Sequence, residues 1–146
     1  MNRRRVLEAL VAAVLVVVLL AVAVVAVPTL VGAEESYVVL SGSMEPSIGA
    51  GDVVIVDRVT PGQLERGDVA VFETDGRSED PEPGRITHRV VEVVERDGSL
   101  AFRTKGDANE AADPTLRDSS QVLGRVRFTI PYLGYLLTAG SPSLRI

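Results

Sequence analysis

One uninterrupted apolar run near the N-terminus constrains this chain more than any other feature. Residues 9–27 are nineteen consecutive positions occupied only by Ala, Val and Leu. At about 1.5 Å per residue, such a helix spans about 28 Å, close to the hydrocarbon thickness of a bilayer. The run therefore predicts a membrane segment, and it leaves residues 34–146, about 113 residues, to fold as a separate domain with its own core.

Charges on either side of the run predict its orientation. Arginines occupy positions 3–5 before it, and Glu34 and Glu35 follow it. By the positive-inside rule, the arginine-rich end stays in the cytoplasm and the domain lies outside. A cleaved secretory signal is the alternative, but the apolar core of such a signal is usually about 7–15 residues long. We expect residues 1–33 to be a cytoplasmic end with an uncleaved anchor.

The residue counts exclude several kinds of site. The chain has no Cys, so disulfide scaffolds, thiol nucleophiles and thiolate metal sites are impossible. His88 is the only histidine and Lys105 the only lysine, so a zinc site with two histidines is also excluded. Beyond Ala33 there are 19 acidic and 12 basic residues, which makes nucleic acid a poor partner. We expect neither a cofactor nor a metal.

After the anchor, short β-like runs alternate with turn signals, and no helical period is sustained. This pattern predicts a mostly β domain attached to one N-terminal transmembrane helix. A polar, Pro-rich surface loop is expected at 74–84, and segment 128–139 reads equally as a final core strand with a turn or as an interfacial segment. The predicted strands are residues 37–40, 52–58, 68–73, 86–95, 100–104 and 124–130.

Three segments contain side chains suited to hydrolysis. Gly42 and Ser43 directly follow the first predicted strand, where a glycine turn can present a hydroxyl beside backbone N–H groups. His88 lies in a predicted strand and can act as a general base, although a single histidine is more often structural. Residues 104–113 form a loop with Lys105 and two aspartates, which by itself reads as a solvated acidic loop.

The order of these segments resembles a known family, the type I signal peptidases, in the branch found in archaea and the endoplasmic reticulum (peptidase family S26, Ser-His-Asp type). Five boxes follow the anchor in the family's order and cover nearly all of the exported part. The implied fold is a signal-peptidase or LexA-like β domain. The boxes are SGSMEPSIGAGDVVIV (41–56), RGDVAVF (66–72), ITHRVV (86–91), TKGDANEAAD (104–113) and VLGRVRFTIPYLGY (122–135).

The resemblance implies a role for each matched residue. Ser43 would be the nucleophile and His88 the general base. The hydroxyl of Ser41 and the N–H of Ser43 would bind the oxyanion. Asp113 would orient His88, and Asp107 would support the same site.

The implied activity is that of signal peptidase I, a serine endopeptidase that removes N-terminal signal peptides from exported preproteins after small residues. The chain would be a single-pass protein of the cell membrane, with its catalytic domain outside. Its partners would be preproteins, the lipid bilayer and the Sec translocon.

Two other hypotheses remain open. In one, the same fold uses a Ser43–Lys105 dyad, as in self-cleaving repressor-like relatives. In the other, the domain is a catalytically inactive anchored scaffold.

Overall fold

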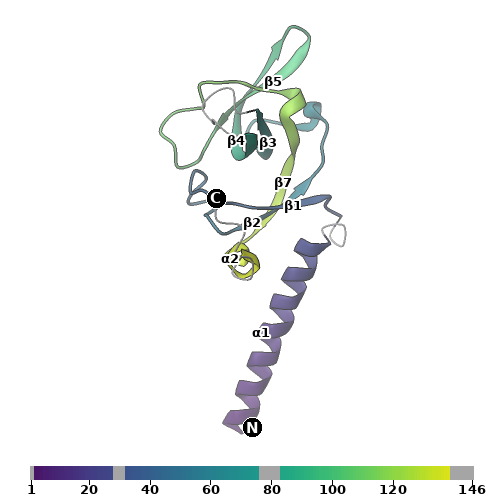
Figure 1. Ribbon diagram of the computed structural model, residues 1–146, viewed down its shortest axis with the longest axis vertical. Coiled ribbons are helices and arrows are strands. Elements are labelled where there is room, and N and C mark those ends of the chain that lie inside the picture. The colour runs from purple at the N-terminus through teal and green to yellow at the C-terminus, as the bar shows by residue number, and fades with distance from the viewer. Residues whose placement is uncertain (1, 28–31, 76–82, 139–146) are drawn as a thin grey trace.

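A long helix and a seven-stranded antiparallel sheet make up the chain in a computed structural model, which describes residues 2–27, 32–75 and 83–138 (Figure 1). The predicted fold class, a mostly β domain behind one N-terminal helix, is confirmed. The strands are β1 (Glu35–Val38), β2 (Val53–Asp57), β3 (Val69–Asp75), β4 (Pro83–Arg96), β5 (Ser99–Lys105), β6 (Arg117–Asp118) and β7 (Val122–Ile130). The helices are α1 (Arg3–Ala26), α2 (Leu133–Thr138) and two 3-10 turns, η2 (Pro61–Gln63) and η3 (Ser119–Gln121).

Helix α1 has the length and composition needed to cross a membrane. Its 24 residues have a mean hydropathy of 3.3 in their most apolar window, and none of that window is buried. Its last turns touch the rest of the described chain, where Val24 and Val25 pack against a cluster around Val53 and Leu133. Most of the apolar surface of α1 is thus left for lipid.

The sheet is antiparallel, with strand order β1-β2-β7-β3-β4-β5-β6. Strand β2 has both faces covered: Val54 and Val56 enter one core cluster, and Val53 and Ile55 enter the cluster beneath α1 and α2. This explains why the strand reads as a continuous apolar run instead of alternating.

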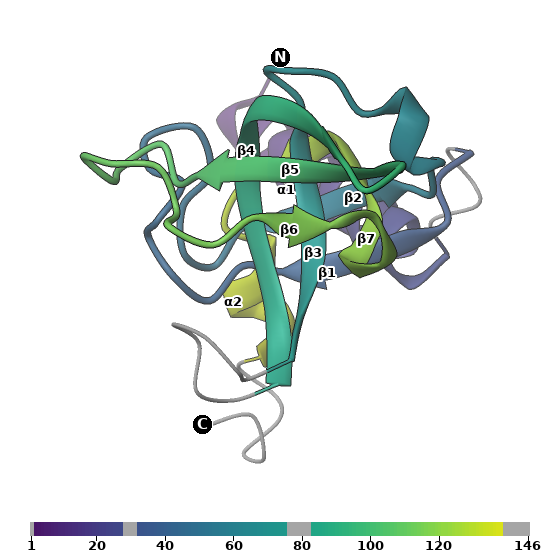
Figure 2. The same ribbon diagram turned by 90° about the horizontal axis from the view of Figure 1, so that it is seen from above.

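Strand β4 changes partner along its length. Its first half pairs with β3, from Pro83 to Arg89, and β5 joins only from Arg89 onward (Figure 2). The register shifts between Val90 and Glu92. The first half of β4 therefore has one edge that no described strand occupies.

The C-terminal apolar segment, expected at 128–139, follows the expected strand and turn as far as Tyr132, where a short helix takes over, and its interfacial position stays a prediction. Strand β7 ends at Ile130, the chain turns, and α2 begins at Leu133. Pro131 cannot donate to the ladder, and Tyr132 has a positive φ of 60° with its N–H bonded to Asp52 Oδ1 at 3.0 Å. These two features end the strand. Ala139, the last residue of the expected segment, lies outside the described residues.

Other strand boundaries shift by a few residues. The first strand, expected at 37–40, lies at Glu35–Val38, and Val39 continues the backbone hydrogen bonding with Asp52 and Gly51 beyond its end. β6 was not predicted, since a two-residue strand has no readable period. The ends of the loop expected at 74–84 belong to β3 and β4, and its centre lies outside the described residues.

Gly51 supplies a test of how α2 packs on the loop before β2. Its φ is +87°, and a Cβ there would overlap the ring of Tyr135, while Gly134 donates its N–H to Gly51 O at 2.8 Å. We predict that Gly51→Ala lowers the free energy of unfolding by about 1–3 kcal/mol. The measurement is denaturant unfolding followed by circular dichroism in detergent.

Gly98→Ala is the matched control for this prediction. Gly98 has a similar φ of +78°, but nothing lies within 4 Å of a Cβ built there. The decrease in the free energy of unfolding caused by Gly98→Ala should therefore reflect backbone strain alone and be smaller than that caused by Gly51→Ala. Equal losses for the two variants would contradict the packing described for α2.

Candidate functional site

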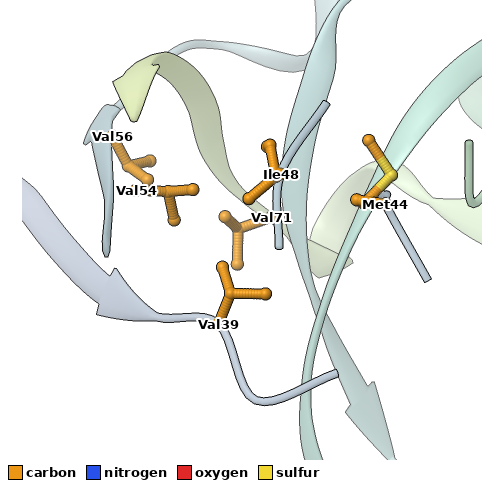
Figure 3. Packing of buried hydrophobic residues seen from close by; sticks show 6 residues of the cluster. All are labelled: Val39, Met44, Ile48, Val54, Val56 and Val71. Atoms are coloured by element: carbon orange, nitrogen blue, oxygen red, sulfur yellow. The ribbon is translucent and has the colours of Figure 1, made fainter. Parts of the chain in front are cut away.

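Ser43 lies in a loop that the core holds at two points. The loop joins β1 to β2, and its Met44 and Ile48 side chains are buried with Val39, Val54 and Val71 (Figure 3). The N–H of Ile48 donates to Met44 O at 2.9 Å. Burying two such side chains contributes about 1.5–3 kcal/mol each, so Ser43 is carried on a fixed turn.

His88 connects Ser43 to a buried carboxylate. It lies on β4 opposite Ala70 of β3, and only 4% of it is exposed. Its Nε2 is 3.2 Å from Ser43 Oγ, and its Nδ1 is 2.7 Å from Asp113 Oδ2. The contact with Ser43 is somewhat long for a hydrogen bond, as is common before a substrate binds.

Asp113 is fixed by β5 as well as by His88. Its N–H donates to Thr104 O at 2.8 Å, and the Thr104 hydroxyl donates to Asp113 Oδ2 at 2.5 Å. Burial works to raise the pKa of Asp113, but the hydrogen bonds from His88 and Thr104 outweigh it and hold the pKa below its usual range. The carboxylate is therefore ionised at neutral pH.

Asp107 occupies a different place from Asp113. Arg89 donates to it twice, from Nε to Oδ1 at 2.8 Å and from an Nη to Oδ2 at 2.6 Å. The Ser47 hydroxyl also donates to Oδ2, at 2.6 Å. Because Ser47 belongs to the loop that carries Ser43, Asp107 ties that loop to β4 and has no described hydrogen bond to His88.

Lys105 lies on the other face of the sheet from His88. The register pairs Lys105 of β5 with Arg89 of β4, and cross-strand partners share a face. His88 precedes Arg89 directly, so its side chain points to the opposite face. Among the described residues, Lys105 forms no hydrogen bond with Ser43.

Ser41, one of the two residues expected to bind the oxyanion, lies beside Ser43. Ser41 Oγ is 3.3 Å from Ser43 Oγ. In the described part of the chain, the Ser43 N–H donates to no protein acceptor, so it is available to a ligand. The Ser43 carbonyl, in contrast, is already occupied by the N–H of Ala108 at 3.0 Å.

The sequence did not predict a role for four residues that contribute to this geometry. Thr104, Arg89 and Ser47 carry only ordinary polar side chains, and their contacts span up to 60 positions in the chain. Gly106 could have been noticed in the sequence, because it is a glycine that directly follows a predicted strand. A Cβ there would lie 2.5 Å from Ser43 O and 3.0 Å from His88 Nε2.

A cleft of about 720 Å³ opens beside these groups. One wall is the segment from Ser36 to Ser41, the other is the first half of β4, and Val71 contributes to the floor. Ser43, His88 and Asp113 lie on its lining. An alcohol, an imidazole and a carboxylate bonded in sequence can move a proton from the hydroxyl, which makes it a nucleophile toward a carbonyl held in the cleft.

The Asp107 ion pair gives a prediction about acid stability. The hydrogen bond from Arg89 lowers the pKa of Asp107 against the effect of burial, and Ser47 lowers it further. A carboxyl with a depressed folded pKa stabilises the fold above its unfolded pKa, and this stabilisation is lost as pH falls through the folded pKa. Asp107→Asn should therefore cost about 1.5–3 kcal/mol at pH 7, with a difference from wild type that shrinks below about pH 4.

The measurement is the free energy of unfolding of both proteins as a function of pH. Glu92→Gln is the control, since Glu92 pairs with Arg103 at 3.1 Å on an exposed surface. Exposed pairs contribute about 0–1 kcal/mol, so this variant should differ little from wild type. A difference between Asp107→Asn and wild type that does not change with pH would contradict the role given to the ion pair.

Comparison with known proteins identifies the family. The family of signal peptidases, peptidase S26, matches residues 5–93. "Signal peptidase complex catalytic subunit SEC11C" of Homo sapiens is 39% identical over 114 residues, which are 72% of this chain and 57% of that protein. "Signal peptidase I W" of Bacillus subtilis (strain 168) is 41% identical over 76 residues, 51% of this chain and 37% of that protein.

The chain spans 57% of the length of its SEC11C relatives, so the match concerns a part of those proteins. The family match covers more than half of this chain and includes both Ser43 and His88. A helix long and apolar enough to cross a membrane, followed by an antiparallel sheet, agrees with it. The chain belongs to the signal peptidases of family S26.

Proposed function

We propose that this chain is a membrane-anchored serine endopeptidase that removes N-terminal signal peptides from exported preproteins, with Ser43 as nucleophile and His88 as general base. The observation that carries the proposal is the continuous chain from Ser43 Oγ through both ring nitrogens of His88 to Asp113, facing one cleft. Family membership supplies the substrate class.

The geometry suggests how the two halves of the reaction proceed. Ser43 Oγ attacks the scissile carbonyl while His88 Nε2 takes its proton, and the ionised Asp113 stabilises the imidazolium. His88 then gives this proton to the leaving amine, and the C–N bond breaks to leave an acyl-serine. Water, deprotonated by His88, attacks the ester, and Ser43 recovers its proton as the signal peptide leaves.

The tetrahedral intermediate needs a donor for its negative oxygen. In this proposal the N–H of Ser43 and the hydroxyl of Ser41 supply it. One such donor contributes about 3–4 kcal/mol to transition-state stabilisation.

The position of the site beside α1 suits a substrate that emerges from a bilayer. The hydroxyl of Ser36, at one end of the cleft, donates to Val25 O of α1 at 3.1 Å. A preprotein presents its cleavage site just beyond its own apolar segment, at this same level. We infer that the arginine-rich N-terminus is cytoplasmic and that residues 34–146 lie outside the cell membrane.

The unoccupied edge of the first half of β4 suits an extended substrate. A strand added there would receive its register from main-chain hydrogen bonds. The scissile bond would then lie beside Ser43, and cleavage after small residues follows from the family. The Sec translocon as a source of substrates stays a prediction.

Single substitutions separate this proposal from the two alternatives. Ser43→Ala and His88→Ala should each lower the rate of cleavage of a synthetic preprotein in lipid or detergent by about 10⁴-fold or more, because the members of such a chain act together. Lys105→Ala should stay near wild type, and so should Ser99→Ala, which removes an exposed serine on β5.

Two outcomes would contradict the proposal. Activity that survives His88→Ala but is lost in Lys105→Ala would indicate the Ser43–Lys105 dyad. No cleavage by the folded wild-type chain at any salt concentration would favour an inactive scaffold.

A further inference from the structure

The cleft is a positively charged feature of an acidic molecule. The chain carries a net charge of −5, yet the charged side chains on the cleft lining are Arg85, Arg117 and Asp113. The carboxylate of Asp113 is already hydrogen-bonded to His88 and Thr104. The remaining positive charge at the open surface comes from Arg85, which is exposed.

Arg85 is held over an aromatic ring instead of a carboxylate. Its guanidinium carbon lies 5.0 Å from the centroid of the Tyr37 ring, across the cleft on β1. Glu73 is its cross-strand neighbour on β3, but within the described residues Arg85 forms no ion pair with it or with any other carboxylate. Glu35 is bound by the Tyr37 hydroxyl and by Arg58.

Other arginines of the domain contrast with Arg85. Arg58, Arg89, Arg103, Arg125 and Arg127 each lie within 4.0 Å of a carboxylate oxygen. Arg85 is thus a guanidinium that lies over the Tyr37 ring and has no carboxylate partner among the described residues.

Its place along β4 indicates which part of a substrate it would meet. Arg85 precedes His88 by three residues, about 10 Å along a strand, and side-chain alternation puts it on the same face of β4 as Arg89, opposite His88. This end of the cleft also holds Ser36, which is bonded to the end of α1. Since the apolar segment of a signal peptide lies in the membrane, the residues that fill this end are those before the scissile bond, about the third to fifth.

We propose that Arg85, positioned by Tyr37, determines charge specificity: it favours an acidic side chain and disfavours a basic one in the short segment that precedes the cleavage site. This inference rests on the proposed function and adds a subsite to it. A substrate carboxylate would pair with a guanidinium that has no carboxylate partner among the described residues, whereas a substrate lysine would bring a like charge to the same place.

The test uses one preprotein with Glu, Gln or Lys at the third, fourth or fifth position before the scissile bond. The readout is kcat/KM in neutral detergent at low salt. At the position beside Arg85, wild type should cleave the Glu substrate roughly three- to tenfold faster than the Lys substrate. Arg85→Gln should bring that ratio close to one, and Arg85→Glu should invert it.

Arg96→Gln is the matched control, because Arg96 lies on the same strand, is exposed and is remote from the cleft. It should keep the wild-type ratio. Tyr37→Leu should reduce the ratio, since it removes the ring beneath the guanidinium together with the hydroxyl that binds Glu35.

Each other result has a distinct meaning. A Glu-to-Lys ratio that is the same in wild type, Arg85→Gln and Arg85→Glu at all three positions would overturn the inference while leaving the peptidase proposal intact. An equal change for all substrates that appears only in anionic vesicles would mean that Arg85 binds lipid phosphate, and would overturn it too. No cleavage by wild type would instead count against the proposed function.

Discussion

The hydrogen bond between His88 and Asp113 is the interaction on which the arrangement of this site depends. It is buried, and its two residues come from β4 and from the loop after β5. A buried carboxylate is costly unless it is fully hydrogen-bonded, and here His88 and Thr104 both satisfy it. The same bond turns the other ring nitrogen of His88 toward Ser43, so one contact both offsets the burial of a charge and directs a proton acceptor.

The loop that carries Ser43 is constrained from several sides. Its apolar residues Met44 and Ile48 enter the core, and Ser47 is held by Asp107. The loop after β5 is bonded to Ser43 O, and α2 is bonded to Gly51, in the loop before β2. A nucleophile placed by separate contacts on each side does not depend on any one of them, which is how a loop on a rigid sheet can keep a reactive geometry.

Local patterns in the sequence were sufficient for the helix and most strands. The apolar run predicts the end of α1 within one residue, although the helix begins earlier, at Arg3, and the β-like runs at 52–58 and 68–73 predict the starts of β2 and β3 within one residue. The pairing of strands is a different matter. β7 lies between β2 and β3 although it is the last strand in the chain, and no period or turn signal carries that information.

In the functional site, too, the residue types can be predicted from local sequence, whereas their spatial arrangement cannot. The residue types needed for hydrolysis are visible in the sequence, and the resemblance to signal peptidases assigns them roles. The sequence alone does not say which aspartate meets His88, because Asp107 and Asp113 lie in one loop, six residues apart. Their separation in space comes from the pairing of β4 with β5, which places Arg89 on one face and His88 on the other.

Nuclear magnetic resonance of the ring nitrogens gives the most direct test of the central claim, that Asp113 orients His88 toward Ser43. His88 is the only histidine, so protein labelled with ¹⁵N-histidine gives the signals of this ring alone. At a pH where the ring is neutral, we expect a proton held on Nδ1, a bare Nε2, and loss of this fixed state in Asp113→Asn. A proton on Nε2, or a spectrum that Asp113→Asn leaves unchanged, would contradict it.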